Sequence, residues 1–211
     1  MAPIIEHHRG VLPHHQEEAQ IISLNWRIAF TLPQHLLDIL QDLHELSTTY
    51  QDERNLDGAK ETFQRNYAIK MQLFDDFLGK YNLPDINLCD PHLAQIVTTS
   101  MRFYDGKLYD LHAYCLMPNH LHLMIQPLAN SSGIYNKVSD IVKRIKSYSA
   151  KEINQILGRT GAFWQHEYYD RFIRDDADYN RSVEYYLYNP VKAKLVAEPQ
   201  DWLYSYCKME E

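Results

Sequence analysis

The pair of strand-like runs at residues 108–117 and 120–127 constrains the fold more than any other part of the sequence. A Pro-Asn pair separates the runs and suits a tight turn, so together they predict an antiparallel β-hairpin. Successive side chains of a strand point to opposite faces, which places His120 and His122 on the same face. The other face of the second run is aliphatic and suits packing against helices: Leu121, Leu123 and Ile125.

The two histidines have a spacing at which two imidazoles can bind one divalent metal ion. By themselves they fit equally well with a pair of half-buried, hydrogen-bonded structural histidines. A helix expected at 176–190 adds Tyr185 and Asn189, which are four residues apart and therefore share a helix face. A phenol is a suitable nucleophile for phosphoryl transfer at a metal-bound phosphate, although an aromatic-rich helix is also typical of a protein core.

The rest of the chain alternates between strand and helix patterns and predicts an α+β fold. A strand at 21–32 ends at Pro33, and apolar residues at helical spacing predict a helical hairpin inserted at about 33–80. Further helices are expected from Pro91 to about 105 and from 134 to 157, with an aromatic strand at 163–175 between the last helices. We expect one domain over 21–211, preceded by a flexible lead-in at 1–20.

The charge distribution leaves room for a nucleic-acid partner, although the net charge of the chain is −7. Residues 137–174 contain eight basic and four acidic side chains, a local charge of +4. A local basic surface can bind a short strand, and so can aromatic rings that stack on bases. The residues expected to contact DNA are Arg144, Lys146, Lys151, Trp164, Arg171 and Arg174.

The lack of a recognisable leader or membrane span, together with the number of cysteines, favours an intracellular protein. The sequence has no apolar run long enough to span a bilayer, and its first residues lack a basic region followed by a long apolar stretch. Its three cysteines are odd in number and widely spaced. We expect no membrane partner and a cytoplasmic location. Cys115, placed by alternation with Leu111, Ala113 and Met117, is expected to be a buried thiol.

Three separated motifs resemble one known family. LMPNHLHLMI resembles the His-hydrophobe-His signature of the HUH single-strand endonucleases. VEYYLYNPVKAKLV resembles the tyrosine helix of the REP-associated tyrosine transposases, which are relatives of the IS200-like single-strand DNA transposases. FWQHEYYDRFIRD and EPQDWLYSY resemble further segments of that family, so the similarity covers about 108–206 and the strand before Pro33.

The resemblance implies a ferredoxin-like antiparallel sheet with packed helices, the HUH endonuclease fold. It also implies that Tyr185 is the nucleophile and that His120, His122 and Asn189 hold Mg²⁺ or Mn²⁺. The implied reaction is cleavage and joining of single-stranded DNA at or near a hairpin, through a 5′-phosphotyrosine link. The implied protein is a prokaryotic monomer or homodimer that acts on nucleoid DNA.

Two other functions stay open at this point. One is a domesticated protein that binds hairpin DNA without cleaving it, and the other is a metal-dependent hydrolase of a phosphoester, for which Tyr185 would be dispensable. Tyr148 is a rival nucleophile on the basic helix, but it lacks an Asn or Gln four residues later. His166 and Glu167 are a weak second metal pair, because adjacent residues of a strand face opposite ways.

Overall fold

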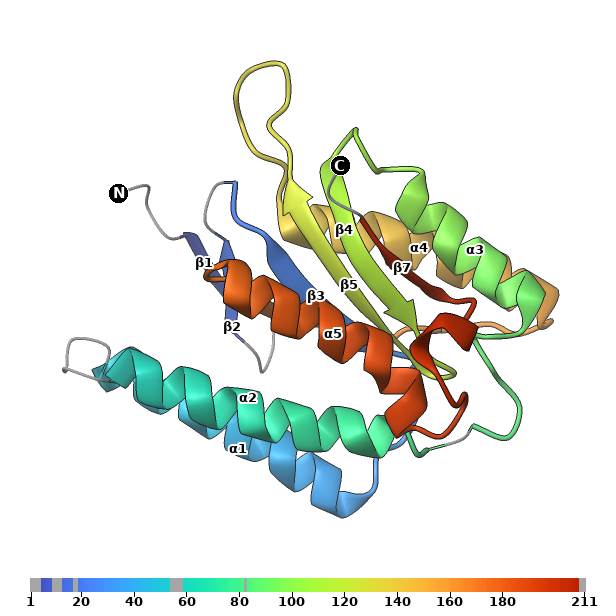
Figure 1. Ribbon diagram of the computed structural model, residues 1–211, viewed down its shortest axis with the longest axis horizontal. Coiled ribbons are helices and arrows are strands. Elements are labelled where there is room, and N and C mark those ends of the chain that lie inside the picture. Colours follow the sequence, from blue (N-terminus) through green and yellow to red (C-terminus); the bar gives the residue numbers. More distant parts are fainter. Residues whose placement is uncertain (1–4, 9–12, 17–18, 54–58, 82, 209–211) are drawn as a thin grey trace.

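The centre of the fold is a five-stranded antiparallel sheet (Figure 1). The structure, a computed structural model, describes residues 5–8, 13–16, 19–53, 59–81 and 83–208. In spatial order the strands are β6 (Tyr169–Phe172), β3 (Ile22–Arg27), β5 (His120–Pro127), β4 (Tyr109–Leu116) and β7 (Ser205–Cys207).

The topology of this sheet is ferredoxin-like. Helix α3 (Pro91–Arg102) precedes β4, and α4 (Val138–Ile156) connects β5 to β6. The chain order β3, α3, β4, β5, α4, β6 and the spatial order β6-β3-β5-β4 are those of the βαββαβ unit. The expected α+β fold is therefore confirmed, with β7 added at the edge beside β4.

The aliphatic face of β5 lies under α3 and α4, which cover one side of the sheet (Figure 1). Asp90 caps α3 by accepting hydrogen bonds from the backbone N–H groups of His92 and Leu93. Both helices are amphipathic, and their apolar residues join those of the strands in the main core. The fully enclosed residues of this core include Leu24, Val97, Leu121, Leu123, Ile125 and Ile145.

The histidine face of β5 is covered by α5 (Asp176–Lys192), which lies across the front of the sheet in Figure 1. A β-bulge between Leu111 and Ala113 changes the alternation of β4 there. Ala113 and Cys115 consequently face α5, whereas Leu111 belongs to the core under α3 and α4. Cys115 is fully buried as expected, but its expected grouping with Leu111 is wrong because of the bulge.

Helix α5 continues two residues past Pro190, where the sequence pattern indicated its end. A proline removes one helical hydrogen bond, but the helix resumes and the backbone N–H of Ala193 donates to the carbonyl of Asn189 at 2.9 Å. Asn189 therefore remains helical, and Tyr185 and Asn189 keep the spacing that places them on one face.

The expected helical insertion consists of α1 (Gln34–Glu53) and α2 (Ala59–Leu78), called the helical hairpin below. Its two helices lie side by side below α5 in Figure 1. Its expected break at Gly58 lies outside the described residues. A separate small core of Leu32, Leu36, Phe74 and Leu78 fixes its base next to Tyr169 of β6.

The N-terminal segment contains two short strands that its sequence did not indicate. β1 (Ile5–His8) and β2 (Pro13–Gln16) pair antiparallel with each other in a separate two-stranded sheet. The remaining residues before Ala19 lie outside the described part of the chain, and the expected flexibility of this lead-in stays a prediction. None of the helices in the described ranges is both long enough and apolar enough to span a bilayer.

The aromatic run 163–175 is less regular than its alternation predicted, since only β6 within it is a strand. Trp164 forms an isolated bridge with Ile28, and its ring is 6% exposed in the main core. Its indole N–H donates to Ser149 Oγ at 2.9 Å. The expected role of Trp164 in stacking on a base is therefore corrected, because its ring is buried in the main core and its indole N–H is already hydrogen-bonded.

Lys146, also expected to contact DNA, instead forms hydrogen bonds within the protein beside the same core. Its ammonium group donates to the backbone carbonyls of residues 165, 166 and 167 at 2.9–3.1 Å. Burial lowers the pKa of Lys146 to about 7, although the negative charge of Glu167 acts to raise it. The side chain ties α4 to the segment before β6, so its expected phosphate contact is replaced by a structural one.

We predict that Trp164→Ala lowers the free energy of unfolding by about 3–5 kcal/mol, because it removes a large ring from a packed core. Urea denaturation followed by circular dichroism measures this change. Trp164→Phe, which keeps a ring in the site, should cost clearly less. Unchanged stability of Trp164→Ala together with weaker binding to single-stranded DNA would restore the stacking role.

Candidate active site

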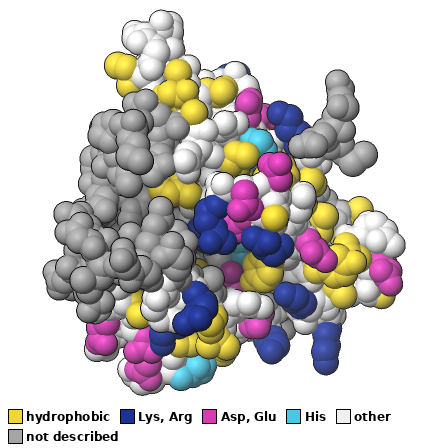
Figure 2. All heavy atoms as spheres, turned by 60° about the vertical axis from the view of Figure 1, so that its left-hand side comes forward, with side chains coloured by type: hydrophobic (Ala, Val, Ile, Leu, Met, Phe, Trp, Pro, Cys, Tyr) yellow, Lys and Arg dark blue, Asp and Glu magenta, His cyan; other side chains and the backbone are white. Residues whose placement is uncertain are grey.

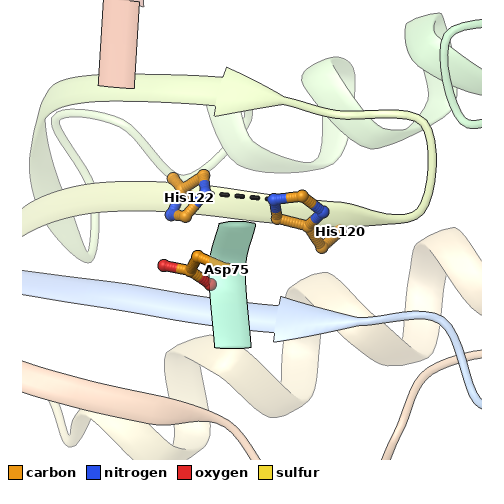
Figure 3. A group of neighbouring side chains, drawn as sticks. All are labelled: Asp75, His120 and His122. Atoms are coloured by element: carbon orange, nitrogen blue, oxygen red, sulfur yellow. Dashed lines mark hydrogen bonds between the residues drawn. The ribbon is translucent and has the colours of Figure 1, made fainter. Parts of the chain in front are cut away.

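The two histidines of β5 meet in the interior of the protein. The Nε2 atoms of His120 and His122 are 3.1 Å apart, and the two rings are 0% and 2% exposed (Figure 3). Their ring planes are nearly perpendicular, at 84°. The expected alternation is thus observed, and it directs both imidazoles away from the aliphatic core toward α5.

Asn119, in the turn before β5, fixes the orientation of the first ring. Its Oδ1 atom lies 2.6 Å from His120 Nδ1, so this ring nitrogen carries the proton and Nε2 keeps a lone pair. The amide of Asn119 donates to the carbonyls of Leu78, at 2.9 Å, and Tyr81 at the end of the helical hairpin. The sequence indicated a turn residue here but not this second role.

Helix α5 brings the two other predicted residues to the same place. The amide nitrogen of Asn189 lies 2.7 Å from His122 Nε2, and the ring centroid of Tyr185 lies 5.7 Å from that of His122. Asn189 is buried and Tyr185 is half-buried. The structure therefore brings together all four residues that the sequence selected, although they come from elements more than 60 residues apart.

The helical hairpin adds a residue that sequence reasoning missed. Asp75 of α2 accepts a hydrogen bond from the Tyr185 hydroxyl, with 3.2 Å between the phenol oxygen and Oδ2, and another from Asn25 Nδ2. Asn25 pairs with His122 across the β3–β5 ladder, so it lies on the histidine face. No local pattern could have found Asp75, because it is one of two adjacent acidic residues in a helix of mixed composition.

Burial determines the protonation states in this cluster. Burial lowers the pKa of His122 to about 3, and burial together with the neighbouring ring lowers the pKa of His120 well below its ordinary value. Both rings are consequently neutral, which is the form that binds metals. Burial raises the pKa of Asp75 to about 7, although the hydrogen bonds from Asn25 and Tyr185 act to lower it. Burial, and then the charge of Asp75, also raise the pKa of the Tyr185 phenol.

The donor atoms fit a divalent metal ion. Among the described residues, Asp75, His120 and His122 form a group whose potential ligand atoms all lie within 4.8 Å of one another (Figure 3). Two donors that bind one ion at right angles, each about 2.1 Å from it, lie about 3 Å apart. The 3.1 Å between the two Nε2 atoms matches that spacing. The amide of Asn189 fits as a further ligand once its oxygen, rather than its nitrogen, faces the histidines.

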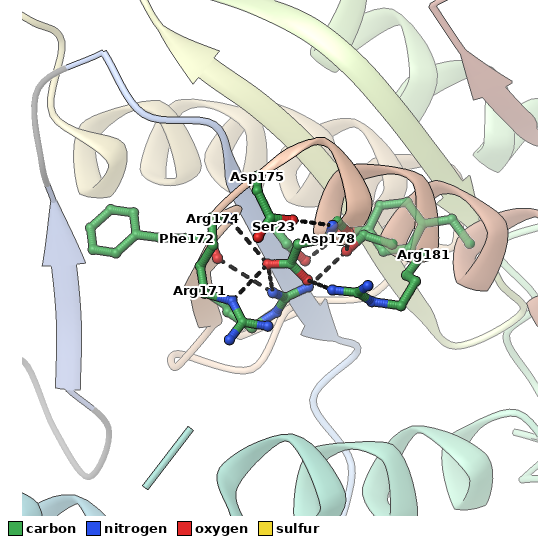
Figure 4. Close-up of polar contacts among 9 residues, drawn as sticks. Ser23, Arg171, Phe172, Arg174, Asp175, Asp178 and Arg181 are labelled. Atoms are coloured by element: carbon green, nitrogen blue, oxygen red, sulfur yellow. Dashed lines mark hydrogen bonds and ion pairs between the residues drawn. The ribbon is translucent and has the colours of Figure 1, made fainter. Parts of the chain in front are cut away.

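Two predicted DNA contacts, Arg171 of β6 and Arg174 between β6 and α5, lie around one buried carboxylate (Figure 4). Asp178 Oδ2 accepts from Arg171 Nη1 at 2.7 Å and from Arg174 Nε at 3.2 Å, while Arg181 lies 3.7 Å from Oδ1. Burial opposes the charge of Asp178, but Arg171 and the hydrogen bonds from Arg174 outweigh it and lower its pKa. Arg171 also donates to Ser182 Oγ at 2.7 Å.

The other basic candidates lie on α4, across the sheet from the histidines. Arg144 and Lys151 are exposed, and Lys151 lies 3.9 Å from Glu152. On the face drawn in Figure 2, basic side chains gather near the centre but are interleaved with acidic ones. A phosphate contact on the face drawn in Figure 2 therefore depends on individual side chains rather than on a uniformly basic surface.

The rival sites do not join this cluster. Tyr148 is 46% exposed on α4, the helix on the aliphatic side of the sheet. His166 and Glu167 lie outside β6, and their side chains contact each other at 3.1 Å. The expectation that they face opposite ways is wrong because this segment is bent rather than extended, but they still offer only two donors at the surface.

Comparison with known proteins finds a family model that is similar to part of the chain. Residues 87–189 match the family model described as "Transposase IS200 like". This part contains His120, His122, Tyr185 and Asn189, but the helical hairpin precedes it.

Two individual proteins are also similar to this chain. A Haemophilus influenzae protein named as a REP-associated tyrosine transposase is 29% identical over 102 residues. The match covers 46% of this chain and 58% of that relative's length. A solved structure of a REP-associated tyrosine transposase bound to a REP hairpin is 15% identical, with a TM-score of 0.48, and the match covers 95% of this chain and 81% of that one.

We predict that Asp178→Asn lowers the free energy of unfolding by about 1–3 kcal/mol at pH 7, because it removes the negative charge and one of the two oxygens that face the arginines. The folded-state pKa of Asp178 lies below its unfolded value, so the stabilisation is present above the unfolded value and is lost as the pH falls through the folded one. The stability difference between the two proteins should therefore shrink below about pH 4. A difference that grows on acidification would contradict the pairing.

Proposed function

We propose that this protein is a metal-dependent endonuclease and strand-transferase of single-stranded DNA, with Tyr185 as the nucleophile. The observation that carries the proposal is the meeting of the Tyr185 phenol, the Asn189 amide and the two histidines in one buried cluster. A protein that only binds DNA has no need for a phenol beside a set of metal ligands.

The chemistry of the proposed step follows from the phenol. Its oxygen forms a bond to the phosphorus of a phosphodiester, and the bond between that phosphorus and the 3′-oxygen breaks. The 5′-phosphate remains on Tyr185, and the phenol proton ends on the released 3′-hydroxyl. Attack by another 3′-hydroxyl reverses the step and joins two strands, so no nucleotide cofactor is needed.

The residues around Tyr185 orient and assist it. Its hydroxyl donates to Asp75, and the ammonium group of Lys192 lies 4.7 Å from the centroid of its ring. His120, His122 and Asn189 are proposed to hold Mg²⁺ or Mn²⁺, which would neutralise charge on the scissile phosphate and favour the phenolate. Asn119 keeps His120 in the tautomer that this role requires.

The proposed substrate is a short single strand next to a DNA hairpin. This part of the proposal is supported by the match of residues 87–189 to the IS200-like transposase model, and by the REP association in the name of the Haemophilus influenzae relative. Arg171, Arg174 and Arg181 offer exposed guanidinium edges for phosphates near the first turns of α5. Arg144 and Lys151 stay proposed contacts on the other side of the sheet.

We predict that the protein forms a covalent adduct with a labelled single-stranded oligonucleotide carrying a hairpin when Mn²⁺ is added. The adduct should be visible as a band of lower mobility in a denaturing gel. Tyr185→Phe should reduce its formation by at least about 1,000-fold, because the attacking oxygen is gone. Tyr188→Phe is the matched control, since Tyr188 lies on the same helix but is 46% exposed, and it should keep the adduct.

We further predict that His120→Ala abolishes the adduct and leaves affinity for the DNA hairpin within about threefold of the unchanged protein. Cleavage measured in the gel and binding measured by fluorescence anisotropy separate the two effects. Full cleavage by Tyr185→Phe would instead indicate a hydrolase that uses water. Binding without cleavage by the unchanged protein, with either metal, would indicate a non-cleaving DNA-binding protein.

A further inference from the structure

Asp75 is a carboxylate in an unusual position, because it is 6% exposed and lies on the helical hairpin rather than in the part that matches the transposase family. Its two described hydrogen-bond partners are Asn25 and Tyr185, both neutral donors. In the part of the chain that the structure describes, no lysine or arginine forms an ion pair with it.

A buried carboxylate of this kind is costly to the folded protein. Removing a carboxylate ion from water is unfavourable, and hydrogen bonds from two neutral donors offset only part of that cost. A nearby positive charge is the usual compensation. The two imidazoles beside Asp75 are neutral, but a metal ion that they bind would place a positive charge next to the carboxylate.

The geometry meets that requirement. A carboxylate oxygen of Asp75 and a nitrogen of each histidine lie within 4.8 Å of one another, and Figure 3 shows the carboxylate beside His122. Two imidazoles and one carboxylate form a donor set that suits Mn²⁺ and similar ions. The carboxylate adds a hard, anionic oxygen ligand to the two neutral nitrogen ligands.

We propose that Asp75 is the anionic ligand of the metal ion in this site, so that the helical hairpin supplies part of the metal centre. This inference rests on the proposed function and deepens it, because that function requires only the two histidines and Asn189. It gives the helical hairpin a chemical role that neither its length nor its composition indicated.

The surrounding contacts hold Asp75 where the proposal needs it. Asn25 is in register with His122 and donates to Asp75, so β3 and β5 position the carboxylate and an imidazole together. The residue before Asp75, Phe74, is buried in the core at the base of the helical hairpin. Asn119 joins the end of α2 to His120. Metal binding and docking of the helical hairpin should therefore stabilise each other.

The test is the affinity of the full chain for Mn²⁺ without DNA, measured by isothermal titration calorimetry and by the free-Mn²⁺ signal in electron paramagnetic resonance. Asp75→Asn keeps the shape of the side chain and one of its two accepting oxygens but removes the charge. We expect it to weaken Mn²⁺ binding by at least about 10-fold. Asp76→Asn is the matched control on the same helix, because Asp76 is not in the donor group, and it should bind as the unchanged protein does.

Two outcomes separate this inference from the proposed function. If Asp75→Asn binds Mn²⁺ as tightly as Asp76→Asn while His120→Ala loses it, the ligands are the histidines and Asn189, and the inference is wrong although the function stands. If His120→Ala also keeps full affinity, the metal site of the proposed function is wrong as well.

A second variant keeps the test decisive if Asp75→Asn folds poorly. Asp75→Cys places a soft thiolate in the donor group, so it should lose affinity for Mn²⁺ and gain affinity for Cd²⁺ by at least about 10-fold. Asp76→Cys controls for a thiol elsewhere on the same turn. Equal Cd²⁺ affinity of the two cysteine variants would overturn the assignment of Asp75 as a ligand.

Discussion

The burial of β5 on both faces is the constraint on which the rest of the structure depends. One face must be apolar to pack against α3 and α4, and Leu121, Leu123 and Ile125 meet that requirement. The other face carries His120 and His122 into a region that water does not reach. Burial keeps both rings neutral, and neutral rings with their Nε2 atoms 3.1 Å apart are prepared to share an ion.

Burial of the polar cluster on this face is unfavourable, and hydrogen bonds between distant elements offset that cost. Asn119 links the β4–β5 turn to the end of α2, and Asn25 links β3 to Asp75. Asn189 and Tyr185 link α5 to His122 and Asp75. Each buried polar group thus meets a partner from another element, which gives the cluster one arrangement rather than several.

Much of this arrangement could be predicted because it rests on local periodicity. The alternation of β5 and the helical spacing of Tyr185 and Asn189 are properties of short segments, whereas the ferredoxin-like arrangement was expected from the family resemblance. Predictions from residue type alone were less successful. Trp164 and Lys146 have the chemistry of DNA contacts, but the structure uses them to close the core, because residue type does not report burial.

The sequence by itself determined which side chains share a face of a strand or a helix, since the backbone repeats of 2 and 3.6 residues are fixed by local geometry. It therefore determined His120 with His122 and Tyr185 with Asn189. Only the tertiary structure decided that Asp75 joins them, because a contact across 110 residues depends on how the helical hairpin docks on the sheet. That docking depends on side chains from several elements that pack together, so it cannot be predicted from any one short segment of the sequence.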